Sequence, residues 1–162
     1  MCSSDLGLGG GLLTANATVT FHDTSTVRQN QASVGGGVFN DFGSTLVFTD
    51  STTIQDNVAV RFAGAIYAEG TLILQDQAVV RGNQSSSPGS GAVELARFPT
   101  ESMSFTMAGN AGVTANVGGG SGGGVVSWQG CGGGSPSLSG VVDRTYSNTP
   151  KQVVLAAGCP TF

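Results

Sequence analysis

The stretch Gly35-Gly36-Gly37-Val38-Phe39 decides the fold, because four other stretches of the chain repeat it at nearly constant spacing. The copies are Gly9 to Leu13, Ala63 to Tyr67, Ser90 to Glu94 and Gly122 to Val126. The repeat is about 27 residues long and has no helical pattern, which is typical of a β-solenoid whose repeats bury their apolar residues against one another.

Short strand-like pieces within each repeat assign the buried face, because successive side chains of a strand point to opposite sides. Four inward columns are predicted. They are Val19, Leu46, Leu72 and Met103; Phe21, Phe48, Leu74 and Phe105; Val27, Ile54, Val80 and Val113; and Val38, Ile66, Val93 and Val125. The pattern predicts an all-β fold, a parallel β-helix of about five coils of roughly 27 residues in the range 7–129.

An asparagine recurs three places after the β-branched residue of the third column. The members are Asn30, Asn57, Asn83 and Asn116. Asn tolerates the left-handed conformation and its amide bonds nearby backbone groups, so we expect a structural column at one corner of the helix.

An aspartate ends one strand-like piece of three successive repeats, at Asp23, Asp50 and Asp76. Two interpretations are open. Each carboxylate caps a turn, or the stacked carboxylates, about 4.8 Å apart, bind calcium. No D-x-D-x-D loop supports calcium, so we expect no cofactor while keeping Ca²⁺ as the weaker alternative.

Composition excludes several classes of function. Only 10% of the residues are charged, whereas about a quarter is usual, and stacked columns disfavour like charges. Six Lys and Arg residues with a net charge of −4 argue against a nucleic-acid partner. No apolar run reaches the roughly 18 residues that cross a membrane, so this portion is not expected to be membrane-embedded.

The two ends of the chain do not follow the repeat pattern. Residues 1–6 look like sequencing-adapter DNA read as protein, so we interpret them as a processing scar and expect the natural chain to extend upstream. In residues 130–162 the repeat decays, which predicts a last coil and a C-terminal fastening segment, with late strands at 141–144 and 152–155. Cys131 and Cys159 are separated by about one coil, so they either form a disulfide in an oxidising compartment or stay as two thiols.

The pairing of a G-G-A-[ILV] block with an apolar-x-x-Asn block resembles the repeats of the polymorphic outer-membrane protein family. Ala63-Gly64-Ala65-Ile66 and Ser90-Gly91-Ala92-Val93 are the nearest matches, and the second block has Val or Ile where the family has Phe. The resemblance implies a right-handed, single-stranded parallel β-helix of the pectin-lyase-like type, exported to the cell surface with an adhesin-like role.

We therefore expect a non-catalytic stalk or adhesin-like region of a larger secreted or surface protein, joined to further coils and contacting glycans or surface proteins. The alternative is a fragment of a polysaccharide-active β-helix enzyme, a lyase or a glycoside hydrolase. Its carboxylates would be Glu69 and Glu94, and its cationic groups Arg61 and Arg97, which lie at loosely matching positions of neighbouring coils.

Overall fold

The computed structural model describes residues 7–86, 89–96, 103–119, 122–129, 137–141, 145–149 and 153–157. These residues contain strands and turns but no helix, and therefore no helix long and apolar enough to cross a membrane. The strands form four sheets in which every pairing is parallel. This confirms the predicted all-β chain of stacked parallel strands.

The four sheets are named here in the order in which the chain visits them. Sheet I contains β1 (Leu12–Thr14), β5 (Val38–Asn40), β9 (Ile66–Ala68), β13 (Val93–Ala96), β16 (Val125–Gln129) and β19 (Val153–Ala157). Sheet II contains β2 (Thr18–Phe21), β6 (Thr45–Phe48), β10 (Thr71–Leu74), β14 (Ser104–Met107) and β17 (Ser137–Ser139). Sheet III contains β3 (Thr26–Arg28), β7 (Thr53–Gln55), β11 (Val79–Arg81), β15 (Gly112–Thr114) and β18 (Thr145–Tyr146). Sheet IV contains β4 (Gln31–Val34), β8 (Val58–Phe62) and β12 (Gln84–Ser85).

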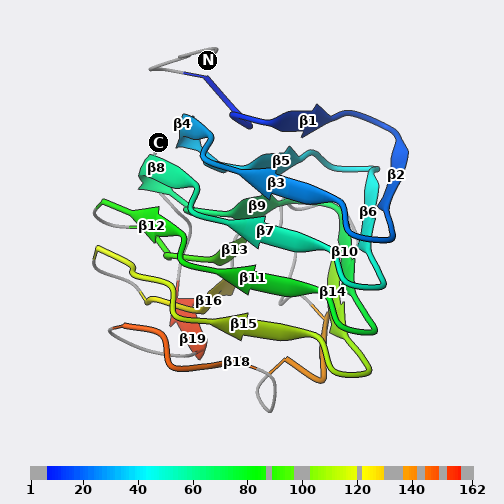
Figure 1. The fold of residues 1–162 in the computed structure, drawn as a ribbon. Coiled ribbons are helices and arrows are strands. Elements are labelled where there is room, and N and C mark those ends of the chain that lie inside the picture. The colour runs from blue at the N-terminus through cyan, green and yellow to red at the C-terminus, as the bar shows by residue number, and fades with distance from the viewer. Residues whose placement is uncertain are drawn as a thin grey trace.

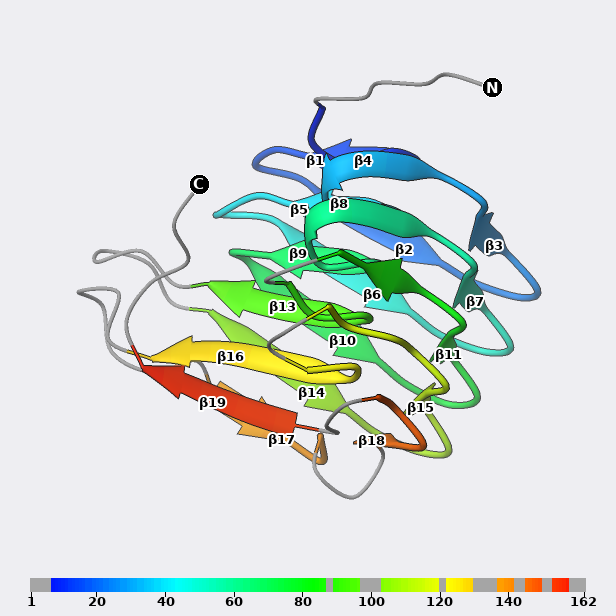
Figure 2. The same cartoon turned by 90° about the vertical axis from the view of Figure 1, so that its left-hand side faces the viewer.

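The first three repeats contribute one strand to each of the four sheets, whereas the described parts of the following repeats contribute strands to sheets I, II and III, and each strand pairs with its counterparts in the adjacent repeats (Figure 1). The pairing keeps register through the repeats, as when β10 pairs with β6 from Thr71↔Thr45 to Leu74↔Phe48. Figure 2 shows the same stack from the side, with β5, β9, β13, β16 and β19 following one another down sheet I.

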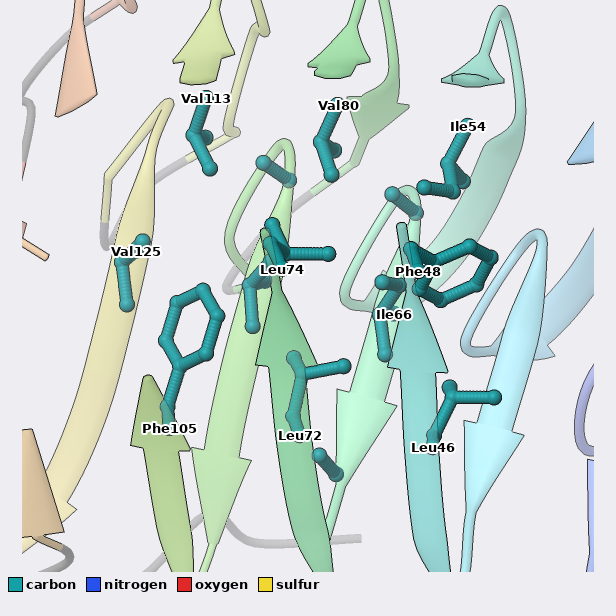
Figure 3. Packing of buried hydrophobic residues seen from close by; sticks show 14 of the residues in the cluster. Leu46, Phe48, Ile54, Ile66, Leu72, Leu74, Val80, Phe105, Val113 and Val125 are labelled. Atoms are coloured by element: carbon teal, nitrogen blue, oxygen red, sulfur yellow. The ribbon is translucent and has the colours of Figure 1, made fainter. Parts of the chain in front are cut away.

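The main core lies between sheets I, II and III (Figure 3). Leu46 and Phe48 of β6, Ile54 of β7 and Ile66 of β9 are fully buried there. The rings of Phe21 and Phe48 stack with their centroids 4.8 Å apart, one repeat on the next. Alternation along each strand therefore places the apolar columns inside, as the sequence predicts.

The predicted register of β14 is wrong by two residues. Leu72 lies beside Phe105 and Leu74 beside Met107, whereas the sequence alignment placed Met103 and Phe105 in these columns. Apolar residues recur at every second position from 103 to 107, so a shift of two keeps the same face buried. The alternation alone therefore could not select the register.

The structure describes only part of the predicted late strands. A strand of sheet II lies earlier, at β17, and Val141 is a buried turn residue beyond it, while 142–144 lie outside the described residues. The predicted strand at 152–155 corresponds to β19, which pairs with β16 from Val125↔Val153 to Gln129↔Ala157. Sheet I thus has six strands, so the described part of residues 130–162 continues the stack for most of a further repeat.

The repeated glycine of the deciding motif is required by close backbone approach. A Cβ on Gly64 would lie 2.2 Å from the carbonyl oxygen of Gly91 and 2.5 Å from that of Gln84, both in the next repeat. Gly36 and Gly123 are equally close to the backbone of the repeat that follows them. At this column any side chain would push two repeats apart, so the motif recurs.

The asparagines form one hydrogen-bonded ladder through successive repeats. The backbone N–H and the Nδ2 of each residue donate to the Oδ1 of the next, at 2.8 to 3.0 Å. The ladder contains Asn30, Asn57, Asn83, Asn116 and Asn148. Asn148, in the repeat where the sequence pattern decays, was not predicted. The side chains also bind strand carbonyls, so the ladder ties sheets III and IV together at their corner.

Asn83→Ala should be one of the most destabilising polar substitutions in the chain. It removes the oxygen that accepts two bonds from Asn57 and a donor to Ile54, all of them buried. An unsatisfied buried polar group costs about 1–3 kcal/mol, so we expect the free energy of unfolding to fall by about 3 kcal/mol or more. Asn30→Ala, at the partly exposed end of the ladder, should cost about 1 kcal/mol. Urea unfolding of both variants tests this, and equal losses would contradict the ladder's role.

Candidate functional site

On the outer face of sheet I, the type of side chain changes from one described repeat to the next. One outward column contains Leu13, Phe39, Tyr67, Glu94, Val126 and Val154. The next outward column contains Asp41, Glu69, Ala96 and Trp128, which follow the printed partners Asn40↔Ala68 and Leu95↔Ser127. Aliphatic, aromatic and acidic side chains thus follow one another along each column.

This outward face is buried by a second, smaller core. Val34 and Phe62, at the ends of β4 and β8, pack with Phe39 and Tyr67 of sheet I, and Trp128 packs against this cluster. The rings of Phe39 and Tyr67 stack at 5.2 Å, and Phe62 lies 6.4 Å from Tyr67. The chain turning from sheet IV into sheet I therefore folds apolar side chains over the outer side of its own sheet.

Glu94 lies in this second core and is fully buried. Its Oε1 accepts a 2.6 Å hydrogen bond from the indole Nε1 of Trp128, and its Oε2 accepts one of 3.0 Å from the backbone N–H of Ser90. Burial raises the pKa of Glu94 to about 7, although these bonds and one from the backbone of Ala63 act in the opposite direction. The side chain is therefore close to half-protonated at neutral pH.

Glu69 is a second carboxyl with an unusual proton affinity, and it is only 7% exposed. Burial raises its pKa to about 7, and the charge of Asp41 and a hydrogen bond with that carboxyl add to the effect. Asp41 belongs to the preceding repeat, whose Asn40 carbonyl accepts the N–H of Glu69 at 2.8 Å. The negative charge of Asp41 in the neighbouring repeat thus favours the protonated form of Glu69.

Tyr67 lies between the two glutamates in the register of sheet I. Its partner in β13 is Glu94, and Glu69 follows it by two residues in its own strand. Burial raises the pKa of the Tyr67 phenol, with smaller contributions from the charges of Glu69 and Glu94. From strand spacing, the Cα atoms of the two glutamates are about 8 Å apart. Two carboxyls with raised pKa values thus lie on the same face of sheet I in adjacent strands.

Of the two arginines predicted for the enzyme alternative, the structure describes only one. Arg61 lies at the end of β8, and its guanidinium is 5.5 Å from the ring centroid of Phe62. Arg97 lies outside the described residues, as do Cys131 and Cys159 and residues 1–6. Asp41 and Trp128 were not among the site residues predicted from the sequence. A signal was present, because Val38-Phe39, Ile66-Tyr67 and Val125-Val126 break strict alternation and so indicate a second buried face.

The aspartate column lies at an exposed corner after sheet II, and all three residues have positive φ. The backbone N–H of Asp23 donates to Oδ2 of Asp50 at 2.9 Å, and that of Asp50 to Oδ2 of Asp76 at 3.3 Å. A hydrogen bond from the Thr49 hydroxyl, followed by that from Asp50, lowers the pKa of Asp76. The carboxylates thus act as turn acceptors for the preceding repeat. Within the described ranges no three His, Cys, Asp or Glu residues are grouped as metal ligands.

Comparison of the chain with protein-family models, with curated proteins and with solved structures found no match.

The raised pKa of Glu94 predicts that the protein loses stability as the pH rises from about 4.5 to about 7. In the folded state the carboxyl keeps its proton up to about pH 7, whereas the unfolded chain releases it near the ordinary value of 4.5. Proton binding therefore favours the fold at low pH, and this contribution is lost as the pH rises through the folded pKa. The midpoint of thermal unfolding, measured from pH 4 to pH 9, checks the slope.

Two substitutions test the assignment to Glu94. Glu94→Gln has no charge to bury, so its unfolding midpoint should fall less between pH 4.5 and pH 7 than that of the wild type. Trp128→Phe removes a hydrogen bond that lowers the pKa, so its fall should extend to higher pH. Wild-type and Glu94→Gln profiles of the same slope would show that another group is responsible.

Proposed function

We propose that the chain is a closed, right-handed parallel β-helix that serves as a non-catalytic stalk or adhesin-like region of a larger secreted or cell-surface protein. The observation that carries this proposal is the parallel stacking of equivalent strands in sheets I, II and III with the asparagine ladder beside them. A structure in which every repeat is bonded to the next by the same groups is a stiff rod. Its length grows with each added repeat, which suits a spacer.

The exposed surface agrees with a binding role for the rod. The outward side chains of sheets II and III are mainly Thr, Ser, Gln and Arg, and few large apolar side chains are exposed among the described residues. Weak contacts repeated along such a surface add up through multivalency. Glycans or surface proteins are the proposed partners, and kinship with the polymorphic outer-membrane proteins and the Cys131–Cys159 disulfide form part of the same proposal.

A specific observation favours the second candidate, a polysaccharide-active enzyme. Glu69 and Glu94 lie on one outward face in adjacent repeats, and burial raises the pKa of each to about 7. Glycoside hydrolysis needs a protonated and an ionised carboxyl on the two sides of the scissile bond. Against this, Glu94 is fully buried, so a substrate reaches it only if the second core opens.

One experiment separates the two functions. Beads coated with the purified chain should be retained on glycan arrays or on cell-surface protein coats, and the wild-type protein should release no products from pectin, alginate or other acidic polysaccharides. Glu69→Gln and Glu94→Gln should then leave retention unchanged. Product release by the wild type that is lost in Glu94→Gln would replace the stalk with the enzyme.

A further inference from the structure

The outer face of sheet II is a regular two-column array of small uncharged side chains. The first column contains Thr18, Thr45, Thr71, Ser104 and Ser137. The second contains Thr20, Val47, Ile73, Thr106 and Ser139. Each of these side chains is exposed or half-exposed, because the alternating residues of the same strands fill the core.

The side chains of this array make no hydrogen bonds within the described part of the chain. No hydrogen bond joins any of them to another described residue, whereas the outer face of sheet III is linked by bonds between Thr26 and Thr53 and between Arg81 and Gln55. The outer face of sheet I is covered by the second core. Of sheets I, II and III, sheet II is thus the one whose outward hydroxyl groups can bind water.

The spacing of the array is fixed in two directions by the backbone. Strands of neighbouring repeats lie about 4.8 Å apart, and residues two apart on one strand are separated by about 6.6 Å. The register holds along the strands, from β2 through β6 and β10 to β14 and β17. Figure 1 shows β2, β6, β10 and β14 directly above one another along one edge of the molecule.

Water on such a surface is ordered by two effects. Threonine and serine hydroxyls hold first-shell water by hydrogen bonds, and the methyl groups of Thr, Val and Ile restrict the orientation of the water between them. The repeat of about 4.8 Å between strands is close to the shorter oxygen repeat on the prism face of hexagonal ice, whereas the repeat of about 6.6 Å along a strand is somewhat shorter than the longer one. A face without charge has no ion or charged polymer as its natural complement, so its chemistry fits a neutral, periodic occupant.

We propose that the outer face of sheet II binds the surface of ice crystals. This function does not need the stalk or adhesin proposal, because it depends only on the two columns and their spacing, but it assigns to ice a face that the adhesin proposal offers to glycans or surface proteins. Adsorbed protein would hold ice-like water across the hydroxyl and methyl lattice and so slow the growth of the crystal plane to which it binds.

The test is ice recrystallisation inhibition by the purified chain, with thermal hysteresis as a second readout. We expect the wild type to inhibit recrystallisation and Thr45→Lys and Thr71→Lys to lose the effect at every concentration at which the wild type acts. The matched controls are Val79→Lys, outward on sheet III, and Val60→Lys, exposed on sheet IV, which should retain it. Thermal unfolding verifies that each variant is folded.

Thr45→Gln and Thr71→Gln provide uncharged variants that disturb the same lattice should the lysine variants fail to fold. Three outcomes would overturn the proposal. The first is no inhibition by the folded wild type, and the second is equal inhibition by the sheet II variants and the controls. The third is retention on crystalline cellulose or chitin without any effect on ice, which would assign the face to a polysaccharide.

Discussion

The backbone hydrogen bonds between equivalent strands are the constraint on which the rest of the structure depends. They place each repeat about 4.8 Å above the next, so every side chain has its own counterpart as its nearest neighbour. Apolar residues such as Leu46 and Leu72 then stack into columns, and Gly64 must lack a side chain because the next backbone passes beside it. The low charge of the chain follows from the same rule, since a charge repeated at this distance repels its copy.

A polar residue can recur at this spacing only where it interacts favourably with the equivalent residue of the next repeat. An asparagine carries both donor and acceptor, so Asn57 accepts from Asn30 and donates to Asn83. An aspartate carries acceptors only, and Asp50 is accommodated because its carboxylate takes the N–H of Asp23. The glutamates of sheet I have no such bond with an equivalent residue of the next repeat, and burial raises the pKa of Glu94 and of Glu69 to about 7.

The features that repeat were predictable from the sequence, whereas the features that occur once were not. The inward columns and the asparagine pattern follow from period-2 alternation and regular spacing, because the same residue type recurs where the same environment recurs. The register of β14 failed because Met103, Phe105 and Met107 satisfy the alternation equally well in two registers. The contact of Trp128 with Glu94 joins residues 34 positions apart that have no counterpart in other repeats, so no periodicity points to it.

The two outer faces show how one scaffold separates these two kinds of chemistry. On sheet II each position repeats nearly the same small side chain, so any interaction it makes is weak, additive and periodic, and a single substitution interrupts a lattice. On sheet I the positions of Phe39, Tyr67 and Glu94 differ although their backbones superimpose in register. Their chemistry depends on particular neighbours, above all the second core supplied by Val34 and Phe62. An ionisable residue such as Glu94 is therefore accommodated on sheet I, where the side chains of the second core cover it. The outward columns of sheet II carry no charge, which suits weak contacts that repeat from strand to strand.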